Sequence, residues 1–206
     1  EPDPTGTLRQ IERFEALCKA VKAVHPGEII CHGANTASIF RYPQLHADMV
    51  RGGLALYGYP PVPEATGLQP AMRWVTRGIY VKTIAPGDRV SYGGTFEATR
   101  PTVVMTLPVG YADGLNRGLS GRTDFIVDGT RVRQVGNICM DQCMFEVDLR
   151  SRVSAPTLDP HIGDEVIIAG PHPTVDCSIT TMAKRAATIE HEVTIGFSHR
   201  MPRYYR

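Results

Sequence analysis

The sequence lacks several signatures that would place it in a specialised class of protein. No apolar run reaches the ~18 residues that a membrane helix needs, and no basic stretch precedes an apolar one, as it does in a secretory signal. A net charge of +1 over 206 residues gives no reason to expect a nucleic-acid or acidic-membrane partner. With 42% hydrophobic and 21% charged residues, the composition is that of an ordinary globular protein.

Paired zinc-binding cysteines are also absent. The five cysteines are an odd number at irregular spacing, without a C-x-x-C unit: Cys18, Cys31, Cys139, Cys143 and Cys177. Cys139 and Cys143 alternate with apolar residues, as buried strand thiols would. We therefore expect no metal site and reduced core cysteines, which fits a cytoplasmic location.

The first 57 residues alternate between helical and strand patterns. Residues 7–24 carry apolar side chains at helical spacing. Residues 28–31 and 49–57 resemble buried parallel strands, and a short helix is expected to follow residues 32–36. These are about two βα units, whereas a closed barrel needs about eight.

Proline and glycine between residues 60 and 70 predict a linker. Short β-branched runs follow, separated by turn signals such as Asp128-Gly129, and predict a compact all-β domain, sandwich or barrel-like. The expected strands are residues 78–84, 102–107, 124–127, 144–147 and 165–169. Residues 178–188 predict a short helix, and residues 189–205 have strand-like character.

His32 and Arg51 are predicted to be partners, because an arginine in an apolar strand must pair its guanidinium and the two strands would be neighbours. Asn35 and Thr36 stand where a helix begins, which favours a phosphate but equally suits simple N-capping. Gly53 would let a ligand approach the backbone. By themselves these residues are as compatible with a structural role as with a binding site.

Three further motifs carry residues suited to chemistry: Ser91-Tyr92-Gly93-Gly94-Thr95, Gly110-Tyr111-Ala112-Asp113-Gly114 and Cys139-Met140-Asp141-Gln142. Tyr92 stands at the end of an expected strand, between small residues that leave its hydroxyl exposed. A phenol, with an unperturbed pKa of ~10, needs a cation or hydrogen bonds to act as a base near neutrality. Each motif alone has a plainer explanation: a packing tyrosine, a turn, or Met140 as core filler.

The order and spacing of all these motifs resemble the alanine racemase family, which uses pyridoxal phosphate (PLP) on fold type III. The resemblance is specific at His32-x-Ala34-Asn35-Thr36 and at Val50-Arg51-x-Gly53-x-Ala55-x-Tyr57-Gly58. It covers nearly the whole chain. It implies an α/β barrel end, the last βα units of a TIM-like barrel, with a linker in residues 1–70. A mainly-β C-terminal domain would follow in residues 71–206.

The resemblance also implies an activity and a cofactor site. The activity is interconversion of L- and D-alanine by a two-base mechanism, supplying D-alanine for peptidoglycan. Arg51 would face the pyridine nitrogen of PLP, and His32 would orient Arg51. Since arginine keeps its proton, the ring nitrogen would stay unprotonated, which favours racemisation over transamination. The cofactor set would comprise Arg51, Asn35, Thr36, Gly53, Leu54 and His191.

The remaining roles implied by the resemblance belong to the β domain. Tyr92 would be one catalytic acid/base and would enter the active site of the opposite subunit, so a homodimer is expected. Tyr111 would lie at the mouth of the substrate channel. The backbone of Met140 would help to hold the substrate carboxylate. Arg117 would support the catalytic tyrosine, although alone it is equally a solvated charge.

The lysine that forms a Schiff base with PLP in this family has no counterpart here. The four lysines, Lys19, Lys22, Lys82 and Lys184, stand in different contexts. We therefore expect that lysine on a missing N-terminal barrel segment and expect this chain alone to be inactive.

His191 departs from the family pattern, which usually has tyrosine there. The shorter imidazole predicts a roomier pocket that accepts serine beside alanine, so a serine or broader-specificity racemase stays open. Basic amino-acid decarboxylases usually set a carboxylate against the ring nitrogen, and Arg51 argues against them. A non-catalytic β interaction module is a further alternative, supported by the missing lysine.

Overall fold

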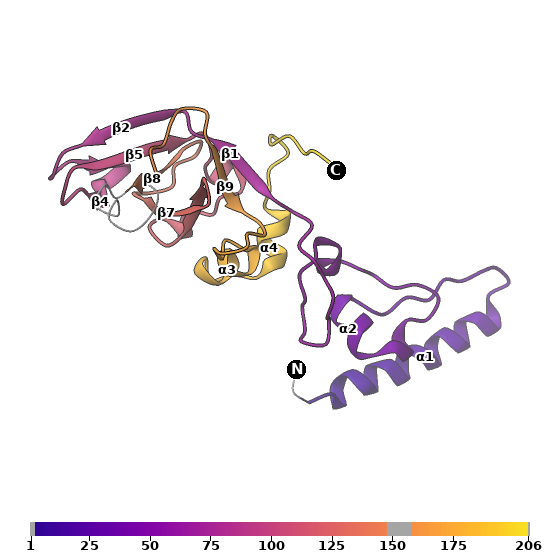
Figure 1. The fold of residues 1–206 in the computed structure, drawn as a ribbon. Coiled ribbons are helices and arrows are strands. Elements are labelled where there is room, and N and C mark those ends of the chain that lie inside the picture. Colours follow the sequence, from indigo (N-terminus) through magenta and orange to yellow (C-terminus); the bar gives the residue numbers. More distant parts are fainter. Residues whose placement is uncertain (1–2, 148–157, 206) are drawn as a thin grey trace. The chain divides into compact units, whose positions relative to one another are not determined.

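The computed structural model describes residues 3–147 and 158–205. The chain divides into two compact units, Glu1–Ala71 and Met72–Arg206 (Figure 1). The N-terminal unit has a small core of Ile11, Ala34 and Leu45. The C-terminal unit is built on a sheet with a much larger core.

Helix α1, Thr5–Val24, dominates the N-terminal unit. Asp3 accepts hydrogen bonds from the backbone N and the Oγ1 of Thr5, at 2.9 and 2.6 Å, and these bonds lower the pKa of Asp3. Within α1, which is described in full, only Ile11 is buried. The helix predicted for residues 7–24 is confirmed, but most of its apolar stripe stays at the surface.

The two strands predicted in this unit are absent from its described residues, 3–71. Segments 31–34 and 48–51 do lie side by side, because Asp48 N and Arg51 N donate to the carbonyls of Cys31 and Ala34, at 3.1 and 2.8 Å. Two bonds do not make a ladder, and a parallel strand needs neighbours along its edges. The unit forms instead α2, Thr36–Arg41, and 3₁₀ turns at Pro43–Leu45 and Leu54–Tyr57.

The C-terminal unit contains a seven-stranded sheet in the order β1-β9-β6-β7-β8-β5-β2, with every neighbouring pair antiparallel. Strands β3 and β4 form a separate hairpin. The strands are β1 Trp74–Arg77, β2 Tyr80–Ile84, β3 Arg89–Val90, β4 Phe96–Glu97, β5 Thr102–Leu107, β6 Asp124–Val127, β7 Thr130–Val135, β8 Cys143–Val147 and β9 Glu165–Ala169. A mainly-β antiparallel domain is therefore confirmed.

Most predicted strands are present, and the Asp128-Gly129 turn joins β6 to β7 with φ values of 46° and 70°, as a tight hairpin requires. Strands β1, β4 and β7 were not predicted. Strand β7 carries Arg131, Arg133 and Gln134, so its sequence is too polar to suggest a strand. Gln134 is nevertheless fully buried, and its amide donates to the carbonyls of Val135 and Gly136, both at 2.9 Å.

Two short helices, α3 Ile179–Arg185 and α4 Glu190–Ile195, follow β9 and lie side by side (Figure 1). An ion pair of 3.0 Å between Arg185 and Asp124 joins α3 to β6. The strand character predicted for residues 189–205 is wrong. Its β-branched residues form α4 because packing buries Val193 and Thr194, and packing outweighs β-propensity.

The cysteines behave mostly as expected. All five are free; Cys31, Cys143 and Cys177 are buried, whereas Cys18 and Cys139 are partly exposed. Cys139 lies in the loop before β8 and not in a strand. In residues 3–147 and 158–205 there is no helix able to span a membrane and no group of three metal-ligating side chains.

Candidate functional site

Arg51 and His32 form a hydrogen-bonded pair in the N-terminal unit, as predicted. Arg51 Nη1 lies 3.0 Å from His32 Nδ1 and donates to the His32 carbonyl at 3.1 Å. Because a guanidinium has no acceptor atom, Nδ1 must accept, and any ring proton of a neutral His32 is on Nε2. Both side chains are exposed, so the rest of the guanidinium fork can face a ligand.

Beside this pair, Thr36 and Gly53 join the two loops. Thr36 is buried, and its Oγ1 accepts from Gly53 N at 2.9 Å. Asn35 acts as the N-cap of α2, since its Oδ1 accepts from Ser38 N at 3.0 Å. The capping alternative thus holds for Asn35. Thr36 differs, because a hydroxyl that accepts one bond still has its own proton to donate.

Tyr92 lies in the connection of the β3–β4 hairpin. An ion pair of 2.9 Å between Arg89 and Glu97 stabilises the hairpin across its two strands. Gly93 and Gly94 have φ values of 72° and 56°, which glycine adopts readily, and they turn the chain sharply after Tyr92. The Tyr92 side chain is 79% exposed, as the sequence predicted for its hydroxyl.

Tyr111 and Met140 lie on two loops that touch. Tyr111 N and Ala112 N donate to the carbonyls of Cys139 and Met140, both at 3.0 Å. A Cβ on Gly110 would lie 2.2 Å from the Cys139 carbonyl oxygen, so only glycine allows this approach. Tyr111 and Met140 are 42% and 54% exposed. Residues assigned to the substrate by resemblance are therefore neighbours in the structure.

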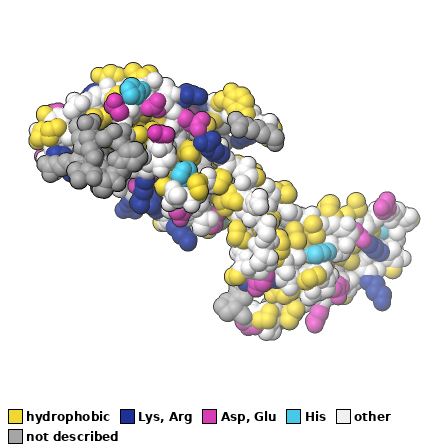
Figure 2. All heavy atoms as spheres, in the orientation of Figure 1, with side chains coloured by type: hydrophobic (Ala, Val, Ile, Leu, Met, Phe, Trp, Pro, Cys, Tyr) yellow, Lys and Arg dark blue, Asp and Glu magenta, His cyan; other side chains and the backbone are white. Residues whose placement is uncertain are grey.

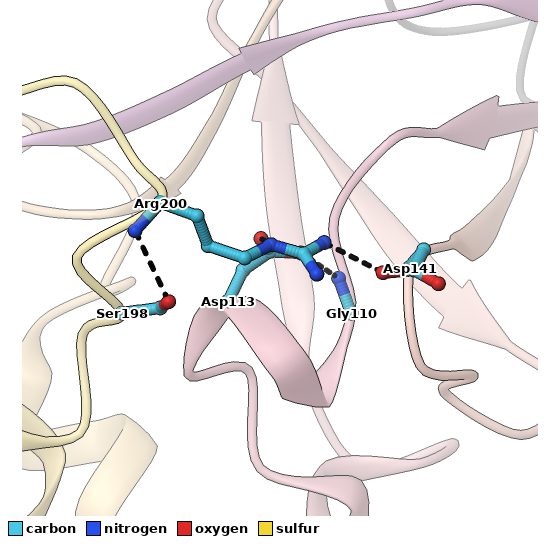
Figure 3. Close-up of polar contacts among 5 residues, drawn as sticks. All are labelled: Gly110, Asp113, Asp141, Ser198 and Arg200. Carbon is cyan, nitrogen blue, oxygen red and sulfur yellow. Dashed lines mark hydrogen bonds and ion pairs between the residues drawn. The ribbon is translucent and has the colours of Figure 1, made fainter.

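Arg200, from the C-terminal tail, ties these two loops together (Figure 3). Its Nε lies 2.9 Å from Asp113 Oδ1, and its Nη2 lies 2.6 Å from Asp141 Oδ1. The buried Asp113 also accepts from Gly110 N at 2.8 Å. Hydrogen bonding to Asp141 and the charges of both carboxylates raise the pKa of Arg200.

Tyr111 and Arg117 line one hollow of about 310 Å³ in the C-terminal unit, together with Glu192 of α4. No hydrogen bond joins Arg117 to Tyr92 among the described residues, and the support that Arg117 would give to the catalytic tyrosine stays a prediction. His191 is exposed on α4 and does not line this hollow.

A larger hollow of about 590 Å³ lies in the N-terminal unit, lined by Lys22, Asp48 and residues 27–30. It contains none of the predicted site residues. Its walls are the segments that lack strand partners, so we attribute it to incomplete packing and not to a binding site.

Sequence reasoning missed Asn137, Glu192 and Arg200. Asn137 Nδ2 donates to the Tyr92 carbonyl at 2.7 Å. These residues lie 45, 100 and 108 positions after Tyr92, and no local pattern marks them. The available signal was an aspartate within each substrate motif, Asp113 and Asp141, which can pair with a cation that the sequence does not identify.

Comparison with known proteins agrees with this geometry. The family models described as the N-terminal and C-terminal domains of alanine racemase match residues 1–61 and 71–205. The chain is 38% identical over its full length to "Alanine racemase" of Symbiobacterium thermophilum and covers 53% of it. It is 39% identical over 98% of its length to that of Desulfosudis oleivorans, covering 51%.

Solved structures give the same result. Alanine racemase from E. faecalis matches all of this chain with a TM-score of 0.83 and 32% identity, over 53% of its own length. Alanine racemase of Clostridium difficile 630 in complex with cycloserine matches 96% of this chain with a TM-score of 0.83 and 30% identity. The match covers 51% of that protein's own length. The chain spans about half the length of the curated relatives it matches. It belongs to the alanine racemase family.

Proposed function

We propose that this chain forms part of a PLP-dependent racemase that interconverts L- and D-alanine and so supplies D-alanine for peptidoglycan. The observation that carries the proposal is the Arg51–His32 pair, 3.0 Å apart, in a chain that also presents an exposed Tyr92. Residues 1–70 would be the last βα units of a TIM-like barrel with their linker, and residues 71–206 the β domain.

The donors of the N-terminal unit fit PLP. Arg51 would donate to the pyridine nitrogen and, because it keeps its proton, leave that nitrogen unprotonated; His32 would hold its orientation. Thr36 can donate its hydroxyl proton to the phosphate. The Leu54 amide, at the start of a 3₁₀ turn, has no partner in a preceding turn to compete with the phosphate. When bound, PLP supplies an electron sink for the charge left at the α-carbon.

The chain's own residues would then manage the proton and the substrate. Tyr92 Oη would remove or return the α-proton on one face. Met140 N–H would hold the carboxylate, and Tyr111 and Arg117 would line the mouth of the channel. Tyr92 would act in the site of a second subunit, as a homodimer requires.

The second base would be a lysine of a segment equivalent to the other half of the relatives. Lys22 is already paired with Asp48 at 2.6 Å, so it does not suit this role. Lys19, Lys82 and Lys184 are exposed on α1, β2 and α3, where no candidate site residue lies.

Alanine turnover by the PLP-loaded protein, completed with that segment, tests the proposal. A Tyr92→Phe variant should lose at least ~100-fold in kcat, the usual contribution of a proton-transferring side chain. Tyr80→Phe is the matched control, since Tyr80 is a half-exposed tyrosine of β2. Turnover that survives Tyr92→Phe would refute the role proposed for Tyr92, and no turnover at all would leave the non-catalytic β module as the better description.

A broader substrate range has one observation in its favour, the exposed imidazole of His191 where the family usually has tyrosine. If His191 makes room for serine, His191→Tyr should lower kcat/KM for serine relative to alanine. An unchanged ratio would exclude this candidate.

A further inference from the structure

The hairpin that carries Tyr92 is packed directly on the loop between β7 and β8. Gly136, with φ at 69°, marks the contact: a Cβ there would lie 2.8 Å from the Ser91 Cβ and 2.9 Å from the Val90 carbonyl oxygen. Such distances exclude any side chain at position 136. The two backbones therefore meet without an intervening layer, immediately before Tyr92.

Two hydrogen bonds run in opposite directions across this contact. Ser91 Oγ donates to the Asn137 carbonyl at 2.7 Å, and Asn137 Nδ2 donates to the Tyr92 carbonyl at 2.7 Å. Ser91 Oγ also lies 3.4 Å from Cys139 Sγ. Residues on both sides of the Ser91–Tyr92 peptide bond are thus held by one asparagine.

Ser91 is in a backbone conformation that such bonds are needed to maintain. Its φ of 69° and ψ of 176° lie in a region that residues with a Cβ rarely adopt. A strained residue of this kind persists only where its surroundings fix it, and such residues cluster at functional sites. Here the fixing contacts come from Asn137.

The Tyr92 side chain has little packing to hold it, because it is 79% exposed. Its direction must therefore come from the backbone of Ser91 and Tyr92. We propose that Asn137 and Ser91 are positioning residues that aim the Tyr92 phenol, with Asn137 fixing the carbonyl of Tyr92 and Ser91 holding the strained bend. The inference rests on the proposed function, since aiming Tyr92 matters for turnover only in a racemase.

The same loop also reaches the other candidate residues. Cys139 accepts from Tyr111 N at 3.0 Å, and Met140 follows it directly. Asn137 therefore begins a segment that joins Tyr92, Tyr111 and Met140, three side chains that would have to act on one small substrate. A shift of ~1 Å in such a constellation can lower a rate ~100-fold.

Four variants separate positioning from simple folding. Asn137→Ala and Asn137→Asp both lose the donor to Tyr92, and each keeps the backbone carbonyl that Ser91 uses. Ser91→Ala loses the hydroxyl and keeps the strain, whereas Ser91→Gly loses the hydroxyl and relieves the strain, because glycine tolerates this φ. Asp88→Ala is the matched control: it removes a bond of 2.8 Å from Ala85 N at the other end of the hairpin.

Amide hydrogen exchange in the chain itself is the first measurement. Gly94 N donates to the Ser91 carbonyl at 3.1 Å and reports the order of the bend. Asn137→Ala should speed its exchange at least ~10-fold while core amides of β5 and β8 are unchanged. Unchanged exchange at Gly94 would overturn the proposal without any activity measurement.

Kinetics of the PLP-loaded racemase are the second measurement. We expect both Asn137 variants to lower kcat ~10- to 100-fold with KM for alanine changed less than ~3-fold, and to shift the pH profile of kcat/KM, while Asp88→Ala has no effect. Ser91→Gly should unfold at a higher temperature than Ser91→Ala without recovering kcat.

Two results would contradict a positioning role: kcat within ~2-fold of the unmodified enzyme in Asn137→Ala, or Ser91→Gly recovering stability and kcat together. An unmodified enzyme that cannot racemise alanine would instead refute the proposed function. The exchange at Gly94 would then still decide whether Asn137 holds the bend.

Discussion

The two units of this chain differ in how much of their apolar side-chain surface they bury. In the N-terminal unit, the 20-residue helix α1 buries only Ile11, and apolar side chains lie at the unit's surface (Figure 2). The exposed apolar residues include Leu17, Val24, Ile30, Met49 and Leu56. In the C-terminal unit, Phe125, Phe145, Met105 and Leu107 are fully buried.

The difference shows how the two kinds of sheet obtain their partners. The antiparallel strands of the C-terminal unit find all their partners within the unit, whether near in sequence, as β6 and β7, or far apart, as β1 and β9, so the unit completes its own sheet. Parallel strands pair only with strands reached through a crossover. The N-terminal unit offers too few of them, and residues 28–31 and 49–57 form no strand in its described part.

The largest expected effect comes from the core of the C-terminal unit. Phe145→Ala in the central strand β8 should lower the free energy of unfolding by about 3–5 kcal/mol, since it leaves a cavity in a closed core. Trp74, the only tryptophan, packs against Phe197 in this unit with ring centroids 4.9 Å apart, so its fluorescence reports the unfolding of the C-terminal unit. Far-UV circular dichroism, to which α1 contributes, reports that of the N-terminal unit. Leu17→Ala on the exposed side of α1 should change stability by less than about 0.5 kcal/mol. Equal changes in the free energy of unfolding from the two variants would contradict the difference in burial between the two units.

A smaller effect is expected from the Arg200 contacts in the C-terminal unit. Arg200→Met leaves the buried carboxylate of Asp113 without its cation and should cost about 1–3 kcal/mol. Asp141→Asn removes only an exposed partner and should cost less than about 1 kcal/mol. Urea unfolding followed by Trp74 fluorescence measures both. Equal losses would show that the buried and exposed contacts of Arg200 do not differ.

The smallest expected effect is a difference in the rate at which two buried thiols react with an alkylating reagent. Cys31 in the N-terminal unit and Cys143 in β8 are 8% and 0% exposed. At pH 8, in urea below the main transition, an alkylating reagent should label Cys31 first, because the smaller core opens more readily. Mass spectrometry of peptides from a Cys18→Ser, Cys139→Ser background resolves the order. Simultaneous labelling would mean that the units open together.

The thiol of Cys143 also makes the free energy of unfolding depend on pH, and the sign of this dependence is definite. Burial raises the pKa of Cys143, so the unfolded chain loses this proton at a lower pH than the folded one. Below pH ~8.5, the unperturbed pKa of a cysteine, the buried thiol makes its full contribution to the free energy of unfolding. This contribution is lost as the pH rises above that value toward the higher folded pKa.

Much of the fold could be predicted because the relevant interactions are local. The spacing of apolar residues in α1 and the Asp128-Gly129 turn depend on residues a few positions apart. Strand β7 could not be recognised, because its polar residues are satisfied by contacts that form only in the sheet. The helix α4 was hidden in the same way, since burial of Val193 and Thr194 decides its conformation.

For the candidate site, the sequence by itself determined the kinds of residue that can do the chemistry. It identified Arg51 with His32 as its partner, and it predicted an exposed Tyr92, because glycine neighbours and the need to pair a guanidinium are local properties. Only the tertiary structure revealed Asn137 and Arg200. Their hydrogen bonds reach 45 residues to Tyr92 and 87 residues to Asp113, and such long-range contacts arise from the packing of the whole sheet.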